Sequence, residues 1–280
     1  MNKKRFNLAI TIIFIVLELI LYFSFLILDL PSFYLGLSKN ISISKNIKFI
    51  SILICFLFVL LPSNNLNPDE DIPVSLDVHV LRFALLFTLI SDYFLLYTSN
   101  IIGGLITFII VQMLYLVRIH RWRVAIRRQT YCKRNVSISN CLIRNIMVSL
   151  LVIIIIIFVG FIFTNIRSFP RESILINWTQ NRYILIVIGL AVFYFSSLVI
   201  NFIDSILINR SYRSKQIGVF SIGLGLFILC DINVGLFNMF KYIKTNEFVS
   251  NMSGFAMWLF YLPSQVLISL SKYKFGYNKQ

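Results

Sequence analysis

The chain has 280 residues, of which 58% are hydrophobic and 13% are charged, and its mean hydropathy is +0.84. Soluble domains average roughly 45–50% apolar and about 25% charged residues, so this composition excludes a soluble protein and indicates an integral membrane protein. The formal net charge of +15 is spread over the segments between apolar runs. Basic residues there orient helices and meet anionic lipid, which argues against a nucleic-acid-binding protein.

Eight apolar runs of about the length of a membrane span fill the chain. A span needs about 20 residues, with a range of roughly 17–25. The runs cover residues 7–29, 47–62, 80–97, 101–119, 141–165, 183–208, 217–240 and 252–271. The first run is too long for the core of a signal peptide, so we expect it to be retained. We predict an all-α integral membrane protein of about eight transmembrane helices, forming a single polytopic domain over residues 1–280.

Basic residues between the runs lie mainly on one side of these eight predicted spans. Seven of them lie between Arg118 and Arg134, after the fourth span, with no acidic residue among them. By the positive-inside rule, this distribution predicts that both termini are cytoplasmic. We expect a multi-pass protein of the bacterial cell membrane whose basic loops contact anionic lipid head groups.

Two aspartates lie inside apolar runs, Asp92 in FALLFTLISDYFLLY and Asp231 in SIGLGLFILCDINVGLF. A carboxylate in a bilayer helix costs about 2.5–3.5 kcal/mol on insertion scales, so each aspartate needs a partner or a use. The two helices that carry them are expected to run in the same direction. This weak internal repeat predicts two parallel four-helix halves with the aspartates at similar depth, although a chance match is an alternative.

The run that follows each aspartate carries a tyrosine and a glutamine at helical spacing. Gln112 and Tyr115 are three residues apart, and Tyr261 and Gln265 are four apart, so each pair shares one helix face. We expect an inward-facing cluster of carboxyl, amide and phenol groups. Interhelical hydrogen bonding, typically worth about 0.6–2 kcal/mol, is the alternative role for such residues. Further candidates for the cluster are Glu18, Tyr194 and Asn201.

The order and spacing of these motifs resemble those of the YhhN family of integral-membrane lysoplasmalogenases, and the resemblance covers most of the chain. In that family a small residue and an aspartate end one helix, and the next helix reads Gly-x3-Phe-x3-His/Gln-x2-Tyr. A Gly-x-Leu-Phe-x2-Ser-Asp helix and a Tyr-x3-Gln helix form the second signature. The matching residues here are Asp92, Gly104, Phe108, Gln112 and Tyr115, then Gly225, Leu226, Phe227, Asp231, Tyr261 and Gln265.

Four positions bear on how far the family's chemistry transfers. Lys45 stands for the lysine of the family's Lys-Pro-Leu motif, but Asn46 replaces its proline. Cys230 replaces the usual serine before the second aspartate, and Gln112 stands where many members have histidine. Because glutamine does not titrate, Gln112 is not expected to act as an acid or a base.

The resemblance implies hydrolysis of the vinyl ether of a lysoplasmalogen within the bilayer, to a fatty aldehyde and a glycerophospho-base, with no metal or organic cofactor. Protonation of the β-carbon gives an oxocarbenium-like cation, as in glycosidases, so one of Asp92 and Asp231 is expected to be the acid and the other its ionised partner. The residues expected to position water and glycerol oxygens are Gln112, Tyr115, Tyr261 and Gln265, and Lys45 is expected to attract the phosphate.

Two other classes of protein also fit the residues taken alone. A small proton- or cation-coupled transporter, or a lipid-binding membrane protein, would use the same carboxylates as ion sites. A structural subunit would use the polar cluster only for assembly. The head group and the oligomeric state are left open by the sequence.

Overall fold

The computed structural model describes residues 3–35, 41–62, 74–129, 143–144, 146–148, 178–243 and 247–273. Within these ranges the chain is helical and contains no strand. Seven helices are long and apolar enough to cross a membrane, which confirms the all-α multi-pass membrane protein predicted above. The predicted span at 141–165 lies almost entirely outside the described residues.

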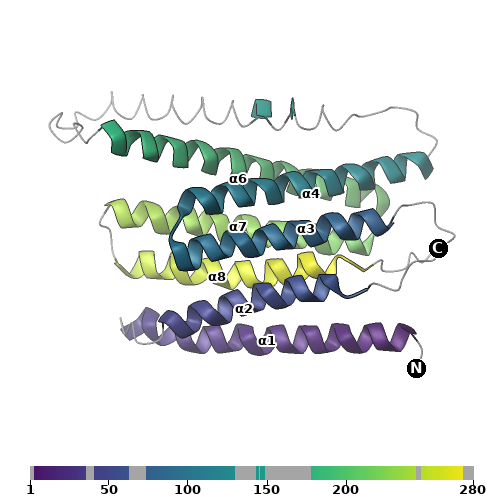
Figure 1. Cartoon of the computed structure of the whole chain (residues 1–280), viewed down its shortest axis with the longest axis horizontal. Coiled ribbons are helices and arrows are strands. Elements are labelled where there is room, and N and C mark those ends of the chain that lie inside the picture. The colour runs from purple at the N-terminus through teal and green to yellow at the C-terminus, as the bar shows by residue number, and fades with distance from the viewer. Residues whose placement is uncertain are drawn as a thin grey trace.

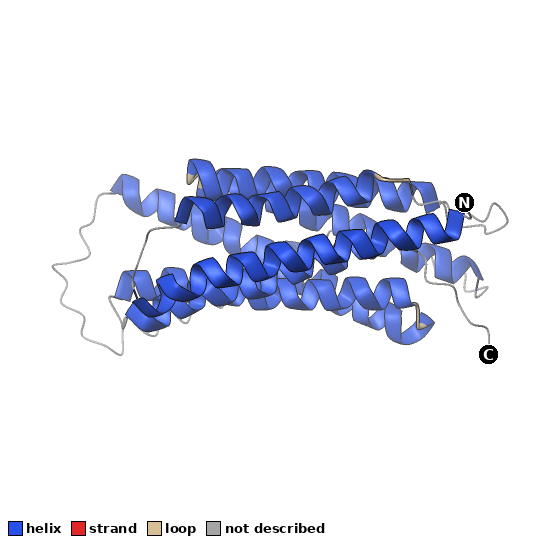
Figure 2. Cartoon of the chain, turned by 90° about the horizontal axis from the view of Figure 1, so that it is seen from below, coloured by secondary structure: helices blue, strands red, loops and turns tan. Residues whose placement is uncertain are grey.

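The described residues form a series of helices. Their bounds are α1 Lys3–Leu35, α2 Ile41–Leu60, α3 Val74–Tyr93, the π-helical turn η1 Phe94–Thr98, α4 Ile101–Gln129, α6 Trp178–Tyr212, α7 Lys215–Ile243 and α8 Glu247–Leu270. Figure 1 shows them lying side by side, with α1 and α2 at one edge and α4 and α6 at the other. The turned view in Figure 2 shows the same bundle of near-parallel helices edge-on. The start of α1 and the end of α8 lie at the same end of the bundle (Figure 1).

The outer face of α1 is apolar and uncovered. Ile13, Ile20 and Ile27 follow one another at seven-residue spacing, and their side chains are 66%, 57% and 71% exposed. Residues seven apart share a helix face, so they form one stripe. A contiguous apolar surface of this kind is suited to lipid rather than water.

Two glycines allow close approach within the helix pairs that carry the aspartates. A Cβ atom on Gly104 of α4 would lie 2.6 Å from the side chain of Leu95, and the hydroxyl of Ser91 donates to the Gly104 carbonyl at 2.7 Å. A Cβ atom on Gly223 of α7 would lie 2.8 Å from Ile268 of α8. Small residues at these contacts bring the backbones together in the way that membrane helices commonly pack.

A buried arginine joins four helices at one end of the bundle. Arg118 of α4 is fully buried and donates from Nε to Oδ1 of Asp77 in α3 at 2.9 Å. Its other nitrogens donate to the hydroxyl and the carbonyl of Ser271, just after α8, at 2.7 and 2.9 Å. Gln216 of α7 donates to the same Ser271 carbonyl at 2.8 Å and lies 3.4 Å from Asp77. This network sets α3, α4, α7 and α8 in register.

Two basic side chains cap the end of α2. Arg82 of α3 donates to the carbonyls of Val59 and Leu60 at 3.1 and 3.0 Å, and Lys272 donates to the carbonyl of Phe58 at 2.5 Å. The last carbonyls of a helix lack intrahelical partners, and the helix dipole makes that end attractive to cations. These contacts tie α2 to α3 and to the end of α8.

Candidate functional site

Asp92 lies near the end of α3, and its carboxyl group is held from across the bundle. The hydroxyl of Tyr261 on α8 lies 2.9 Å from Oδ1 and 2.8 Å from Oδ2 of Asp92. Both residues are buried, at 3% and 4% exposure. The carboxyl group therefore has a fixed direction, set by a residue of another helix.

Asp231 on α7 has an equivalent arrangement with a different helix. The hydroxyl of Tyr194 on α6 donates to Oδ2 of Asp231 at 2.7 Å. Tyr194 is buried, whereas Asp231 is only half-buried. Each predicted catalytic aspartate thus has its own tyrosine.

The two carboxyl groups lie at the same depth in the bundle. Asp92 comes 15 residues after Asp77 in α3, and Asp231 comes 15 residues after Gln216 in α7. Asp77 and Gln216 contact one another in the Arg118 network, so these two residues lie at the same level along the bundle. At 1.5 Å per residue, each aspartate lies about 22 Å further along the bundle.

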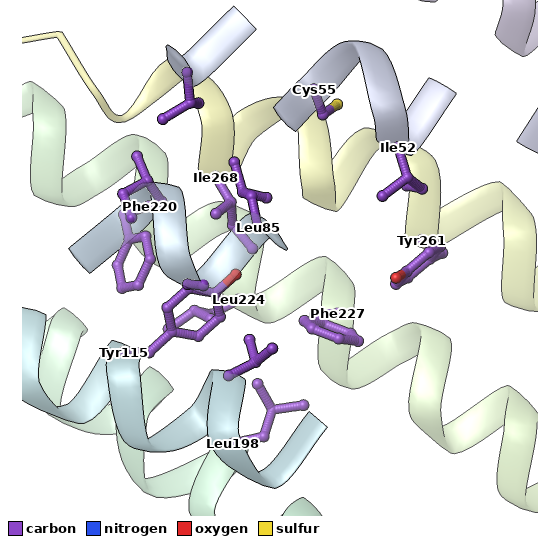
Figure 3. Packing of buried hydrophobic residues seen from close by; sticks show 14 of the residues in the cluster. Ile52, Cys55, Leu85, Tyr115, Leu198, Phe220, Leu224, Phe227, Tyr261 and Ile268 are labelled. Carbon is purple, nitrogen blue, oxygen red and sulfur yellow. The ribbon is translucent and has the colours of Figure 1, made fainter. Parts of the chain in front are cut away.

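Aromatic rings fill the space between the two aspartate–tyrosine pairs. The ring of Phe227 lies 5.5 Å from that of Tyr261 and 6.4 Å from that of Tyr194, in edge-to-face arrangements. Figure 3 shows the rings of Phe227 and Tyr261 turned toward each other from neighbouring helices. Phe108 packs against Tyr194 and Phe227 at 5.5 and 5.8 Å. The ring of Phe227 therefore contacts the tyrosine of each pair, so both aspartate–tyrosine pairs border one aromatic cluster.

Buried amide groups lie on α4, α6 and α8, one or two helical turns from the aromatic rings along the chain. Asn201 of α6 donates to the side-chain oxygen of Gln112 at 3.1 Å and to its carbonyl at 2.9 Å. Gln112 Nε2, Asn201 Oδ1 and Gln265 Oε1 are buried without a hydrogen-bond partner among the described residues. A buried polar group left without a partner costs about 1–3 kcal/mol. These three atoms therefore mark places suited to water or to polar atoms of a ligand.

Tyr115 and Glu18 occupy separate positions. Tyr115 is fully buried, packs against Phe220 at 5.3 Å, and points its hydroxyl into the interior (Figure 3). Glu18 accepts hydrogen bonds from Ser51 at 2.5 Å and Cys55 at 3.6 Å, both on α2. Glu18 therefore belongs to the α1–α2 contact, and the hydrogen bonds of the two aspartates do not involve it.

Lys48, rather than Lys45, is the α2 lysine that faces the site. Lys45 is exposed, whereas Lys48 is 7% exposed and its Nζ lies 2.5 Å from Oδ2 of Asp29 on α1. The same Nζ lies 4.9 Å from the ring centroid of Trp258, whose ring is 5.4 Å from that of Tyr261. The sequence contains a signal for this residue, because Lys48 is the basic residue inside the apolar run 47–62.

No family model matches the chain, and neither a curated protein nor a solved structure matches it. Its function is therefore inferred from the placement of its own residues. The site contains two carboxyl groups at one depth. Each is bound by a tyrosine, and aromatic rings lie between them.

Proposed function

We propose that this protein is a lysoplasmalogenase-like membrane hydrolase, which cleaves the vinyl ether of a lysoplasmalogen to a fatty aldehyde and a glycerophospho-base. The observation that carries the proposal is the pair of bonds Asp92–Tyr261 and Asp231–Tyr194 at equal depth around Phe227. Two carboxyl groups across an apolar region are the groups that acid-catalysed hydrolysis of an enol ether requires.

The reaction proceeds in three steps. A carboxylic acid transfers its proton to the β-carbon of the vinyl ether, and the electron pair of the double bond forms the new C–H bond. Water adds to the resulting oxocarbenium carbon and gives a proton to the ionised carboxylate, which forms a hemiacetal. In the third step the carboxylate that gave up its proton takes the hydroxyl proton of the hemiacetal, the bond to the glycerol oxygen breaks, and the other carboxyl group protonates that oxygen. This releases aldehyde and alcohol and restores both carboxyl groups to their starting states. Asp92 and Asp231 together supply the acid and the ionised partner.

The surrounding side chains suit the intermediate and the water. The faces of Tyr194, Phe227 and Tyr261 are attractive to a positive charge, as aromatic rings are in cation–π contacts. The unpartnered atoms of Gln112 and Asn201 can hold a water molecule in an otherwise apolar interior. An enol ether between these rings would therefore have a proton donor, a charge stabiliser and a nucleophile within reach.

The proposal includes an orientation in the bacterial cell membrane. Placing the basic segment after α4 in the cytoplasm puts the start of α1 and the end of α8 there too, and puts the aspartates toward the outer side. At the cytoplasmic end, the α6–α7 turn has a hollow of about 580 Å³ that contains Arg210, Arg213 and Lys215 in its lining. Anionic lipid head groups suit this surface.

The test is release of aldehyde from a defined substrate. Purified protein is incubated with lysoplasmenylethanolamine, and fatty aldehyde is measured; the saturated alkyl-ether analogue, which has no double bond to protonate, is the control. Asp92→Asn and Asp231→Asn are each expected to abolish aldehyde release while the protein stays folded. Asp204→Asn is the matched control, because Asp204 pairs with Arg123 and Arg144 instead. Aldehyde release at the wild-type rate by either aspartate variant would remove that residue from catalysis.

A transporter remains the second class to test. Transporters commonly bind substrate at unwound segments of broken helices. Pro263 lies inside α8, but the helix continues across it to Leu270. Proline cannot bond to the carbonyl four residues before it, and here the hydroxyl of Tyr22 donates to that carbonyl, of Leu259, at 3.2 Å. Solute uptake into vesicles without chemical change of the solute would favour the transporter over the hydrolase.

A further inference from the structure

Three buried amide side chains in the interior of the bundle each have one atom without a hydrogen-bond partner among the described residues. These atoms are Gln112 Nε2 on α4, Asn201 Oδ1 on α6 and Gln265 Oε1 on α8, and all three residues are fully buried. A buried polar atom without a partner loses the hydrogen bonds that it makes to water and gains none in return. One of these atoms is a donor and two are acceptors, so the partner that they need must both donate and accept. Water does both, and buried water commonly binds such groups.

The three amides lie between the aspartates and the Arg118 network. Asn201 and Gln265 follow the tyrosines that bind the aspartates by seven and four residues, which is about 10 and 6 Å along α6 and α8. Gln112 precedes Arg118 by six residues, which is about 9 Å along α4. Asn201 also donates directly to Gln112. The unpartnered atoms therefore belong to one stretch of the interior, on the side of the aspartates toward the end of α8.

Six helices enclose this stretch. α2, α3, α4, α6, α7 and α8 contact one another in that order, and α8 contacts α2, so the six form a closed ring. Fully buried hydroxyl groups lie near the aspartates, since Thr88 comes one turn before Asp92 on α3 and Ser197 comes one turn after Tyr194 on α6. Side chains three or four residues apart share a helix face, so both hydroxyl groups are on the side of the aspartate–tyrosine pairs.

Polar side chains on α4 connect the amides to the Arg118 network. Gln112, Tyr115 and Arg118 follow one another at three-residue spacing, about 4.5 Å along the helix axis per step. The hydroxyl of Tyr115 points into the interior (Figure 3). One water molecule bridges two polar atoms about 5.5 Å apart, which is twice the length of an O–H···O hydrogen bond. A few water molecules therefore suffice to join the Arg118 network to the level of the aspartates.

We propose that a chain of ordered water molecules occupies the interior between the Arg118 network and the two aspartates, held by Gln112, Asn201 and Gln265. The chain supplies the water that adds to the oxocarbenium carbon, and it is refilled from the end of the bundle at which α8 ends. Each turnover consumes one water molecule, which has to cross an otherwise apolar interior. The supply role rests on the proposed hydrolase function, whereas the existence of the chain does not.

The first test detects water beside buried side chains without any substrate. A short X-ray pulse makes hydroxyl radicals from water, and a scavenger in the detergent solution removes those formed outside the protein. Side chains beside internal water are still oxidised, and mass spectrometry identifies them. Tyr115 is expected to be oxidised although it is fully buried, and Phe25, equally buried on α1, is the control. Oxidation of Tyr115 no faster than that of Phe25 overturns the proposal.

A variant on α8 tests which groups hold the chain. Gln265→Met removes an amide that binds the water and keeps the length of the side chain, so oxidation of Tyr115 should fall several-fold. Leu262→Met, at a buried apolar position of the same helix, is the matched control and should leave that oxidation unchanged. If the polar groups form only a dry set of interhelical hydrogen bonds, Gln265→Met changes nothing, which overturns the proposal. Gln112→Met takes its place if Gln265→Met does not fold.

The rate of aldehyde release separates the supply role from the hydrolase itself. Gln265→Met should lower kcat by about two- to tenfold, the scale of one hydrogen bond, with KM little changed because the substrate is still bound. Reduced oxidation of Tyr115 together with wild-type kcat overturns the supply role. If the wild type releases no aldehyde, the hydrolase proposal fails, and the oxidation of Tyr115 still decides whether the water chain exists.

Discussion

The hydroxyl of Tyr261 lies 2.8 Å from Oδ2 of Asp92, although the two residues are 169 positions apart in the chain. Tyr261 belongs to the second half of the predicted repeat and Asp92 to the first. The bond therefore joins the two halves at one of the two proposed catalytic carboxyl groups. It holds the carboxyl group in one direction, which is what proton transfer to a carbon atom requires.

Loss of this hydroxyl should reduce catalysis more than stability. Tyr261→Phe keeps the ring and its packing but frees the carboxyl group of Asp92 to turn. We expect kcat for aldehyde release to fall by up to about 10²-fold, the scale of a 1 Å misplacement of a reacting group. KM should change little. Tyr93→Phe is the matched control, because Tyr93 is 50% exposed on the same helix as Asp92. Equal rates for wild type and Tyr261→Phe would show that the hydroxyl has no part in catalysis.

Breaking the Arg118 network should destabilise the bundle strongly. Asp77→Ala leaves the guanidinium of Arg118 buried without its carboxylate, which typically costs about 3–5 kcal/mol. Replacing both residues, as Asp77→Leu with Arg118→Met, should recover most of that loss because no charge stays buried. Thermal unfolding in detergent measures both effects.

The control for this network is an ion pair nearer the surface. The side chain of Arg144 is 42% exposed where it meets Asp204. The Asp204 side chain is 6% exposed, but Arg123 remains 3.0 Å from it when Arg144 is replaced, so Arg144→Met leaves no buried charge without a partner and should shift the unfolding temperature less than Asp77→Ala. A shift as large as that of Asp77→Ala would contradict the importance assigned to burial.

Seven of the eight predicted spans and the similar depth of the two aspartates could be predicted from the sequence, but the hydrogen-bond partners of the aspartates could not. Hydropathy identifies a membrane helix because each span must be apolar along its length. Helical spacing shows which residues share a face, for example Tyr261 and Gln265. It does not show which helix that face meets, and so it does not show that Tyr261 binds Asp92 or that Tyr194 binds Asp231.

The Lys48–Asp29 pair shows the same limit at the edge of the site. The place of Lys45 in a motif predicts that it binds the phosphate, but Lys45 is exposed and lies one turn from Lys48. Lys48 and Asp29 are 19 residues apart on different helices, and their contact depends on how α1 and α2 pack. A lone lysine inside an apolar run was the available signal, since such a residue needs a partner.

Substitution of a helix-contact glycine should destabilise the pair α7–α8. Gly223→Ala places a Cβ atom 2.8 Å from Ile268 and 3.1 Å from the carbonyl of Ser264, so one helix must shift. Overpacking of this kind typically costs about 1–3 kcal/mol. At Gly189 of α6 no atom of another described helix lies within 4 Å of an added Cβ, so Gly189→Ala should be neutral or stabilising. Thermal unfolding that ranks the two variants in the opposite order would contradict the close contact.

The stability of the protein should depend on pH through Lys272. Burial and the nearby charge of Arg82 lower the pKa of Lys272 from its ordinary value of 10.5 to about 7. Between these pH values the unfolded chain binds a proton at this lysine that the folded protein does not bind, so the free energy of unfolding rises with pH across the window. Below pH 7 the lysine is charged in both states and its contribution no longer changes.

The measurement is the difference between wild type and a variant that lacks the titrating group. Lys272→Met keeps a long side chain at this position and removes the amine, which lies over the rings of Phe58 and Tyr273. We expect the unfolding temperature of the wild type to rise relative to that of Lys272→Met as the pH increases from 7 to 10. Lys45→Met, at an exposed position, should follow the wild type at every pH. A constant difference in unfolding temperature between wild type and Lys272→Met over this range would show that Lys272 keeps an ordinary pKa in the folded protein. In that case both Arg82 and Lys272 would be charged where they bind the last carbonyls of α2.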